Sequence, residues 1–286
     1  MKILLVIEPH KHRYMRHMVE YMGDITIINQ EEYLSVNQDE YGVLIYNTFA
    51  DETHPTKFDW ELISKTDEKY RTFKGLKILL DSYDNGTRDG FARFHDFTTP
   101  RIKINPSYDF MKTYNIIMTI PYICYSFFCN PQEDRPNKLL CAMNMKGMPE
   151  GRRTVREKIK DLNPITDFLP IQEHAKRLCK TLINIVPTGA GDSSFSHANT
   201  LASGALLMAE ENIKDIKLLP FVDLDDGVHF VTYNLDNIQE KLNDLFENPQ
   251  KIEEIRLAGL EAFKVGYDYK RSAEQLLEFI HENNRK

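Results

Sequence analysis

The chain has 286 residues, 42% hydrophobic and 28% charged, which is the balance of a folded globular protein and not of a disordered one. Its net charge of −7 gives no overall attraction to nucleic acid or to an anionic membrane, and leaves room only for a local basic patch. No apolar stretch approaches the roughly 20 residues that span a bilayer, and "MKILLVIEPHKHR" has no cleavage site of small residues. We therefore expect a cytoplasmic protein, and the length favours two domains with a cleft between them.

The cysteines indicate neither a zinc site nor a disulfide framework. Cys124, Cys129, Cys141 and Cys179 form no CxxC pair and have no paired histidines at zinc-site spacing. We expect four buried thiols and no resident cofactor.

Short apolar runs alternate with helical patterns in the first part of the chain. Residues 2–7 are typical of a strand buried on both faces of a parallel sheet, and apolar residues at helical spacing follow from Tyr14 to Met22. Further strands are expected at 25–28, 42–47, 75–81, 100–105 and 116–122. This alternation predicts a doubly wound α/β domain over residues 1–122.

A second α/β series follows a segment that gathers prolines and charges, so we expect a linker at 123–137. Strands are expected at 138–144, 182–187, 205–210 and 228–234. Helices are expected in "GMPEGRRTVREKIKDL", in "IQEHAKRLCKT", and over 237–247, 249–265 and 269–282. We assign 138–268 to the second α/β domain, and residues 269–286 to a last helix that crosses back to the first.

The stretch "GAGDSSFSHANTLAS" follows the strand "LINIVP" and leads into a helix. Small residues let the backbone approach a phosphate, and a helix N-terminus directs unpaired N–H groups at it. Gly191, Ser193 and Ser194 are therefore candidate phosphate ligands. The alternative is that a serine only caps the helix. The stretch is neither a Walker loop nor a GxGxxG motif.

Residues 172–280 resemble the donor-binding domain of GT-B glycosyltransferases of group 1, of the spore-maturation-like type. The resemblance runs through "NTLASGALLMAEE", "LLPFVDLDDGVHFVTYNLDNIQEKLNDLFENPQKIEEIRLAGLEAF" and "YDYKRSAEQLLEFI". It implies two Rossmann-like domains that face a cleft, with the acceptor on the first and a nucleotide sugar, such as a UDP sugar, on the second. The nucleotide sugar is a co-substrate.

The resemblance also implies roles for single residues. Asn199 stands where the family often has a glutamate that binds the ribose, and His197 stands where it often has an arginine. A basic residue, Arg152 or Arg153, should neutralise the leaving diphosphate, because arginine matches phosphate oxygens with a fixed fork. Gly147 would permit close approach. The alternative for the arginines is a solvated helix face.

A catalytic base is expected in the loops that follow the strands of the first domain. Asp84, Asp51 and His10 are the candidates for an inverting transfer, with Asp81 beside Asp84, whereas a retaining enzyme lacks such a base. Each of these residues also suits a turn. "DLDDG" at 223–227 is interpreted as a solvated turn, so we expect catalysis without a metal.

The same loops gather basic and aromatic residues that could bind a polyanionic acceptor. They are His10, Lys11, His12, Arg13, Arg16, Arg88, Arg93, His95, Arg101 and Lys103, with Tyr83, Phe91, Phe94 and Phe97. Sugar transfer onto a hydroxymethylated base of phage-type DNA is one such chemistry. Scattered surface charge is the alternative for this set. A nucleotide-sugar epimerase and an inactive sugar-nucleotide or nucleic-acid binding module are the alternatives for the whole chain.

Overall fold

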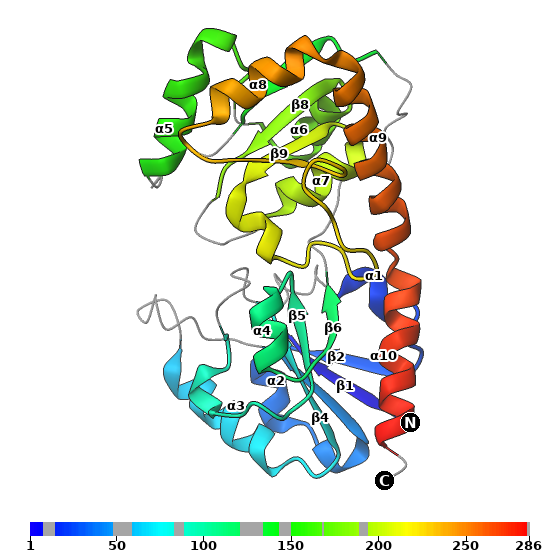
Figure 1. Cartoon of the computed structure of the whole chain (residues 1–286). Coiled ribbons are helices and arrows are strands. Elements are labelled where there is room, and N and C mark those ends of the chain that lie inside the picture. Colours follow the sequence, from blue (N-terminus) through cyan, green and yellow to red (C-terminus); the bar gives the residue numbers. More distant parts are fainter. Residues whose placement is uncertain are drawn as a thin grey trace. The chain divides into compact units, whose positions relative to one another are not determined.

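The computed structural model describes residues 1–7, 15–47, 59–82, 89–120, 134–142, 150–167, 169–188 and 194–284. These residues form two compact units (Figure 1). The first unit holds the described residues up to Ile120 and those from Asp268 onward, and the second holds those from 134 to Tyr267. Each unit is built on its own parallel sheet.

The sheet of the first unit has the order β2-β1-β3-β4-β5-β6, and all its neighbouring strands are parallel. The strands are β1 (Ile3–Val6), β2 (Ile25–Ile28), β3 (Val43–Asn47), β4 (Leu76–Asp81), β5 (Arg101–Ile104) and β6 (Ile116–Ile120). They confirm the strands expected in this part of the chain. Because β1 lies between β2 and β3, the direction of winding reverses between β1 and β3, where ligands of such folds bind.

Helices cover both faces of this sheet. They are α1 (Arg16–Val19), α2 (Gln30–Ser35), α3 (Trp60–Thr72), α4 (Tyr108–Thr113) and α10 (Tyr269–Asn283), with the short helices η2 (Gln38–Glu40) and η4 (Ala92–Phe94). On one face, Tyr33 of α2 and Tyr70 of α3 pack with Leu4 and Leu44 of the sheet. α10 packs beside β6 and α1 (Figure 1), so the last helix completes the first unit. Of the helix expected from Tyr14, the described part is α1.

The sheet of the second unit has the order β10-β9-β8-β7, again with parallel neighbours. The strands are β7 (Asn137–Leu140), β8 (Thr181–Val186), β9 (Leu206–Glu210) and β10 (Val231–Tyr233). Ile165 bridges Leu140 in parallel, on the side of β7 away from β8. After β7 the chain first passes Ile165 on one side of this strand and then enters β8 on its other side. The winding therefore reverses between β7 and β8.

The strand expected at 228–234 is shorter, because its first residues belong to a turn. The Asp226 carboxylate accepts a hydrogen bond from the Thr232 N–H at 2.8 Å, and the Gly227 N–H donates to the Phe230 carbonyl at 2.7 Å. Gly227 has a φ of +80°, which favours glycine. The segment expected to be a turn at "DLDDG" is thus held by side-chain and backbone hydrogen bonds.

The helices of the second unit are α5 (Glu150–Ile159), α6 (Ile171–Cys179), α7 (Phe195–Ser203), α8 (Ile238–Glu247) and α9 (Pro249–Gly266), with η5 (Lys160–Leu162) and η6 (Glu211–Asp215). Val155 of α5 and Leu242 of α8 share a core with Ile183 and Met208 of the sheet. α7 packs against α6 and α9. The helices expected in this half are confirmed to within a few residues.

Two further findings concern the cysteines and the length of the apolar helices. Cys179 is disulfide-bonded, so the expectation of four thiols is wrong for this residue, whereas Cys141 is a free buried thiol. Among the described residues, no helix is both long enough and apolar enough to cross a membrane.

Candidate functional site

Arg152 joins α5, the helix that follows β7, to the segment that follows β8. It lies in the first turn of α5, which follows β7, and its Nε donates to the carbonyl oxygen of Thr188, which follows β8, at 2.9 Å. Its two terminal nitrogens make no hydrogen bond to any residue in the described ranges. The guanidinium is thus anchored through one nitrogen, and the terminal pair is left to bind a phosphate or carboxylate.

The N-terminus of α7 lies after the same strand, β8. Ser194 is the N-cap residue, and its N–H donates to Nδ1 of His197 at 3.0 Å. Nδ1 therefore accepts a hydrogen bond, and a neutral ring with its proton on Nε2 fits this contact. His197 is 2% exposed, and burial lowers its pKa to about 4. At neutral pH this side chain is uncharged, so it caps the helix and does not replace the charge of the family's arginine.

Asn199 lies two residues further along α7 than His197 and is 2% exposed. Its Nδ2 donates to the Phe195 carbonyl oxygen at 2.7 Å, so the amide is held by its own helix. Binding of a ribose hydroxyl by this residue stays a prediction.

Two arginines that sequence reasoning missed hold the other end of α7. Arg256 Nη1 donates to the Gly204 carbonyl at 3.1 Å, and Arg135 Nη2 donates to the Ser203 carbonyl at 2.5 Å. Both carbonyls lie where a helix leaves its acceptors without intrahelical partners. Arg256 lies far from α7 in the sequence, and Arg135 lies in the expected linker. No sequence pattern therefore predicts that these arginines contact the end of α7.

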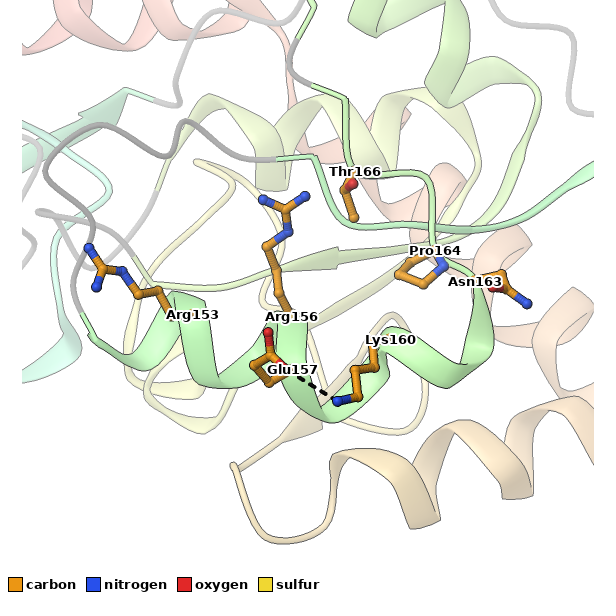
Figure 2. Close-up of a pocket in the computed structure, with 7 residues that line it drawn as sticks. All are labelled: Arg153, Arg156, Glu157, Lys160, Asn163, Pro164 and Thr166. Atoms are coloured by element: carbon orange, nitrogen blue, oxygen red, sulfur yellow. Dashed lines mark hydrogen bonds and ion pairs between the residues drawn. The ribbon is translucent and has the colours of Figure 1, made fainter.

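Arg153 lies in different surroundings from Arg152. It lines a pocket of about 610 Å³ together with Arg156, Glu157 and Lys160, and the other wall is formed by Asn163, Pro164 and Thr166 (Figure 2). Arg152 does not line this pocket. The structure therefore separates the two arginines that the sequence left as alternatives.

Comparison with solved structures identifies the architecture. An α-glucosyltransferase in complex with UDP-glucose and DNA containing an abasic site aligns with a TM-score of 0.62 at 10% identity, over 98% of each chain. The sucrose-phosphate synthase of Thermosynechococcus elongatus aligns with a TM-score of 0.64 at 7% identity, over 99% of each chain. A glycosyltransferase from Rickettsia africae aligns with a TM-score of 0.58 at 10% identity, over 98% of each chain.

The chain has the GT-B fold. No protein-family model and no curated protein sequence matches it. The two parallel sheets are the two Rossmann-like domains of this fold. The spore-maturation-like subtype stays a prediction.

Several candidates for donor binding and catalysis lie outside the described ranges. They are Gly147, Gly191, Ser193, His10, Asp51 and Asp84. The structure does describe the strands that precede the candidate bases. β1 precedes His10 and β3 precedes Asp51, and these strands are neighbours, with Val6 opposite Tyr46. The reversal of winding in the first unit therefore lies between the strands that lead to His10 and Asp51.

Much of the basic and aromatic set expected at an acceptor surface has a structural role instead. Lys103 pairs with Asp81 at 3.1 Å with both side chains fully buried, and Arg101 pairs with Asp89. Arg93 pairs with Asp67 at 2.6 Å, and Phe91 belongs to the core. The acceptor interpretation is wrong for Arg101, Lys103 and Phe91, because these side chains are fully buried, and Arg93 is engaged by the Asp67 carboxylate. Asp81 is likewise no exposed base.

Phe97 keeps the exposure that a stacking role requires. It is 52% exposed and stacks on Tyr114 with ring centroids 5.3 Å apart.

Among the described residues, no cluster of three or more histidine, cysteine, aspartate or glutamate side chains could hold a metal ion.

Proposed function

We propose that this protein is a glycosyltransferase that moves a sugar from a nucleotide-sugar donor, such as a UDP sugar, to an acceptor hydroxyl without a metal. The observation that carries the proposal is the position of Arg152, which lies on the helix that follows β7 and donates to Thr188, just after β8, the strand at which the winding reverses. Folds of this kind bind their ligands at that point. The GT-B fold supports the proposal, as do similar structures of an α-glucosyltransferase in complex with UDP-glucose or UDP.

The proposed chemistry needs positive charge at the leaving group. Transfer breaks the bond between the anomeric carbon and a phosphate oxygen, and forms a bond from that carbon to the acceptor oxygen. The nucleoside diphosphate leaves with the electron pair, so its negative charge grows as the bond breaks. Arg152, with the N-terminus of α7 at Ser194 and the proposed ligands Gly191 and Ser193, would stabilise that charge.

The acceptor proton needs a destination as well. In an inverting transfer, one of His10, Asp51 and Asp84 would accept it from the acceptor hydroxyl while the sugar is attacked from the opposite face. His10 and Asp51 follow the two strands between which the winding of the first unit reverses. We therefore favour these two over Asp84, which follows β4.

We propose a hydroxymethylated base in DNA as the acceptor. Two similar α-glucosyltransferase structures contain DNA, one of them with an HMU base. The sucrose-phosphate synthase is as similar in fold, so the fold alone does not select a nucleic-acid acceptor.

The test is a transfer reaction with a panel of UDP sugars and a DNA duplex that contains a hydroxymethylated base. Digestion of the duplex and mass spectrometry should show a nucleoside heavier by one sugar residue. Arg152→Gln should lower the amount of product by at least about 10²-fold. Lys158→Gln, a change on the same helix, is the control and should leave the amount of product unchanged. Binding of the donor without transfer to any acceptor would identify a binding module, and release of free sugar that needs no acceptor would identify an epimerase-like hydrolysis.

A further inference from the structure

The pocket beside α5 is lined by a row of cations. Arg153 and Arg156 lie three residues apart on α5, and Lys160, four residues further, is the first residue of η5; all three line the same pocket. Seven residues at 1.5 Å per residue separate the first from the last by about 10 Å. Figure 2 shows Arg153 and Arg156 from successive turns, with the Arg156 guanidinium extended toward Thr166.

The described lining of the pocket includes one carboxylate besides the three cations. Glu157 pairs with Lys160 at 3.4 Å, and their side chains are 75% and 64% exposed. An exposed pair of this kind is weak and is screened by salt, so Lys160 can exchange this partner for a phosphate. The pocket keeps an excess of positive charge in a protein whose net charge is −7.

The opposite wall favours phosphate over a base or a sugar. It consists of Asn163, Pro164 and Thr166, and no aromatic side chain lines the pocket on which a base could stack. Asn163 and Thr166 offer hydrogen-bond donors for phosphate oxygens.

We infer that this pocket, which we call the α5 pocket, binds backbone phosphates of the nucleic-acid acceptor. The inference rests on the proposed function and names a second anion site beside the proposed donor site at Arg152. A DNA strand carries one phosphate per 3.4 Å of helix axis, so a row of about 10 Å can meet two or three successive phosphates. Contacts to phosphates position a strand without reading its sequence.

The experiment measures binding of a short fluorescein-labelled DNA duplex to the full chain by anisotropy, from about 50 to about 200 mM salt. The test variant is the triple substitution Arg153→Gln, Arg156→Gln and Lys160→Gln. The matched control is Lys158→Gln, Lys176→Gln and Lys180→Gln, which removes the same charge from the same unit without touching the α5 pocket. Affinity for a UDP sugar is measured in parallel for all three proteins.

The α5 pocket variant should weaken duplex binding at least tenfold and reduce the salt slope by about 0.9 for each lost phosphate contact. The control should change affinity less than threefold, and affinity for the UDP sugar should not change in either variant. Equal weakening by the control, or loss of UDP-sugar binding in the pocket variant, would overturn the inference. Binding of a UDP sugar without binding of the duplex to the unmodified protein would also overturn it and leave the glycosyltransferase proposal standing. Binding of neither would contradict both.

Discussion

Arg152 and Arg153 show how neighbouring residues of one type acquire different surroundings. Arg152 is half-buried and fixed through Nε to the Thr188 carbonyl, whereas Arg153 is exposed in the α5 pocket. The sequence predicted that one of them meets the diphosphate. It could not choose, because the choice depends on where α5 lies relative to the end of β8.

Arg152→Ala should reduce turnover of the donor by about 10²- to 10³-fold, the usual effect of removing one fixed donor that stabilises charge in the transition state. Arg152→Lys should recover only part of the loss, because lysine keeps the charge and loses both the Nε anchor and the fork. Initial rates of UDP release measure this. Lys158→Ala, a change on the same helix outside the α5 pocket, is the control and should stay within threefold of the unmodified protein. A larger loss there than at Arg152 would contradict the assignment.

His197 should make stability depend on pH. Burial lowers its pKa from 6.5 to about 4, so between these values the unfolded chain binds a proton that the folded protein does not. The free energy of unfolding is therefore highest above pH 6.5 and falls as the pH decreases toward 4, by about 2 kcal/mol between pH 7 and pH 5.

His197→Gln removes this titration, and its amide oxygen can still accept the Ser194 N–H in a capping box. Urea unfolding of both proteins at the two pH values gives the difference, and the lowered pKa of His174 is common to both. An equal loss of stability in the two proteins would show that His197 is not the group responsible.

At the scale of elements, α7 depends on the arginines at its C-terminal end. Arg256→Met fills a similar volume and leaves the Gly204 carbonyl without its donor, and we expect the free energy of unfolding to fall by about 2 kcal/mol. Equilibrium unfolding in urea measures this change. Lys264→Met, which removes an exposed pair with Glu261 at 3.4 Å, is the control and should stay within about 0.5 kcal/mol. An equal decrease in the free energy of unfolding for both variants would mean that the Arg256 contact does not stabilise the fold.

The sequence predicts the strands well, because residues such as Ile3 to Val6 are apolar on both faces and bounded by turn residues. It does less well with short helices. α2 is six residues long and was not expected, although Asn29 and Glu32 form a capping box that the sequence already contained. Sequence position alone also suggested that Arg101 and Lys103 lie at a surface. Their burial depends on Asp89 and Asp81, which pair with them across the fold.

At the scale of the whole molecule, the chain returns to its first unit through α10. Leu276 is fully buried in this helix, and Leu276→Ala should cost about 2–5 kcal/mol. Hydrogen exchange should show lost protection in β6 and α1, which contact α10, and unchanged protection in β8 and α7. The exposed substitution Glu278→Ala is the control. Equal loss of protection in both units would contradict the assignment of α10 to the first.

The sequence allowed the fold of the whole chain to be predicted, but not the identity of the acceptor. The alternation of strands and helices and the resemblance over 172–280 predicted the GT-B fold, which the comparisons confirm. The acceptor could not be predicted in the same way, because structures that share this fold at about 10% identity include both a DNA complex and a sucrose-phosphate synthase.

The most direct test of the central claim is calorimetric titration of the full chain with UDP sugars, for the unmodified protein beside Arg152→Ala and Arg153→Ala. We expect one UDP sugar to bind the unmodified protein and Arg153→Ala with the same affinity, and to bind Arg152→Ala at least tenfold more weakly. Binding that is unaffected by Arg152→Ala, or absent from the unmodified protein for every UDP sugar, would contradict a donor site at the ends of β7 and β8.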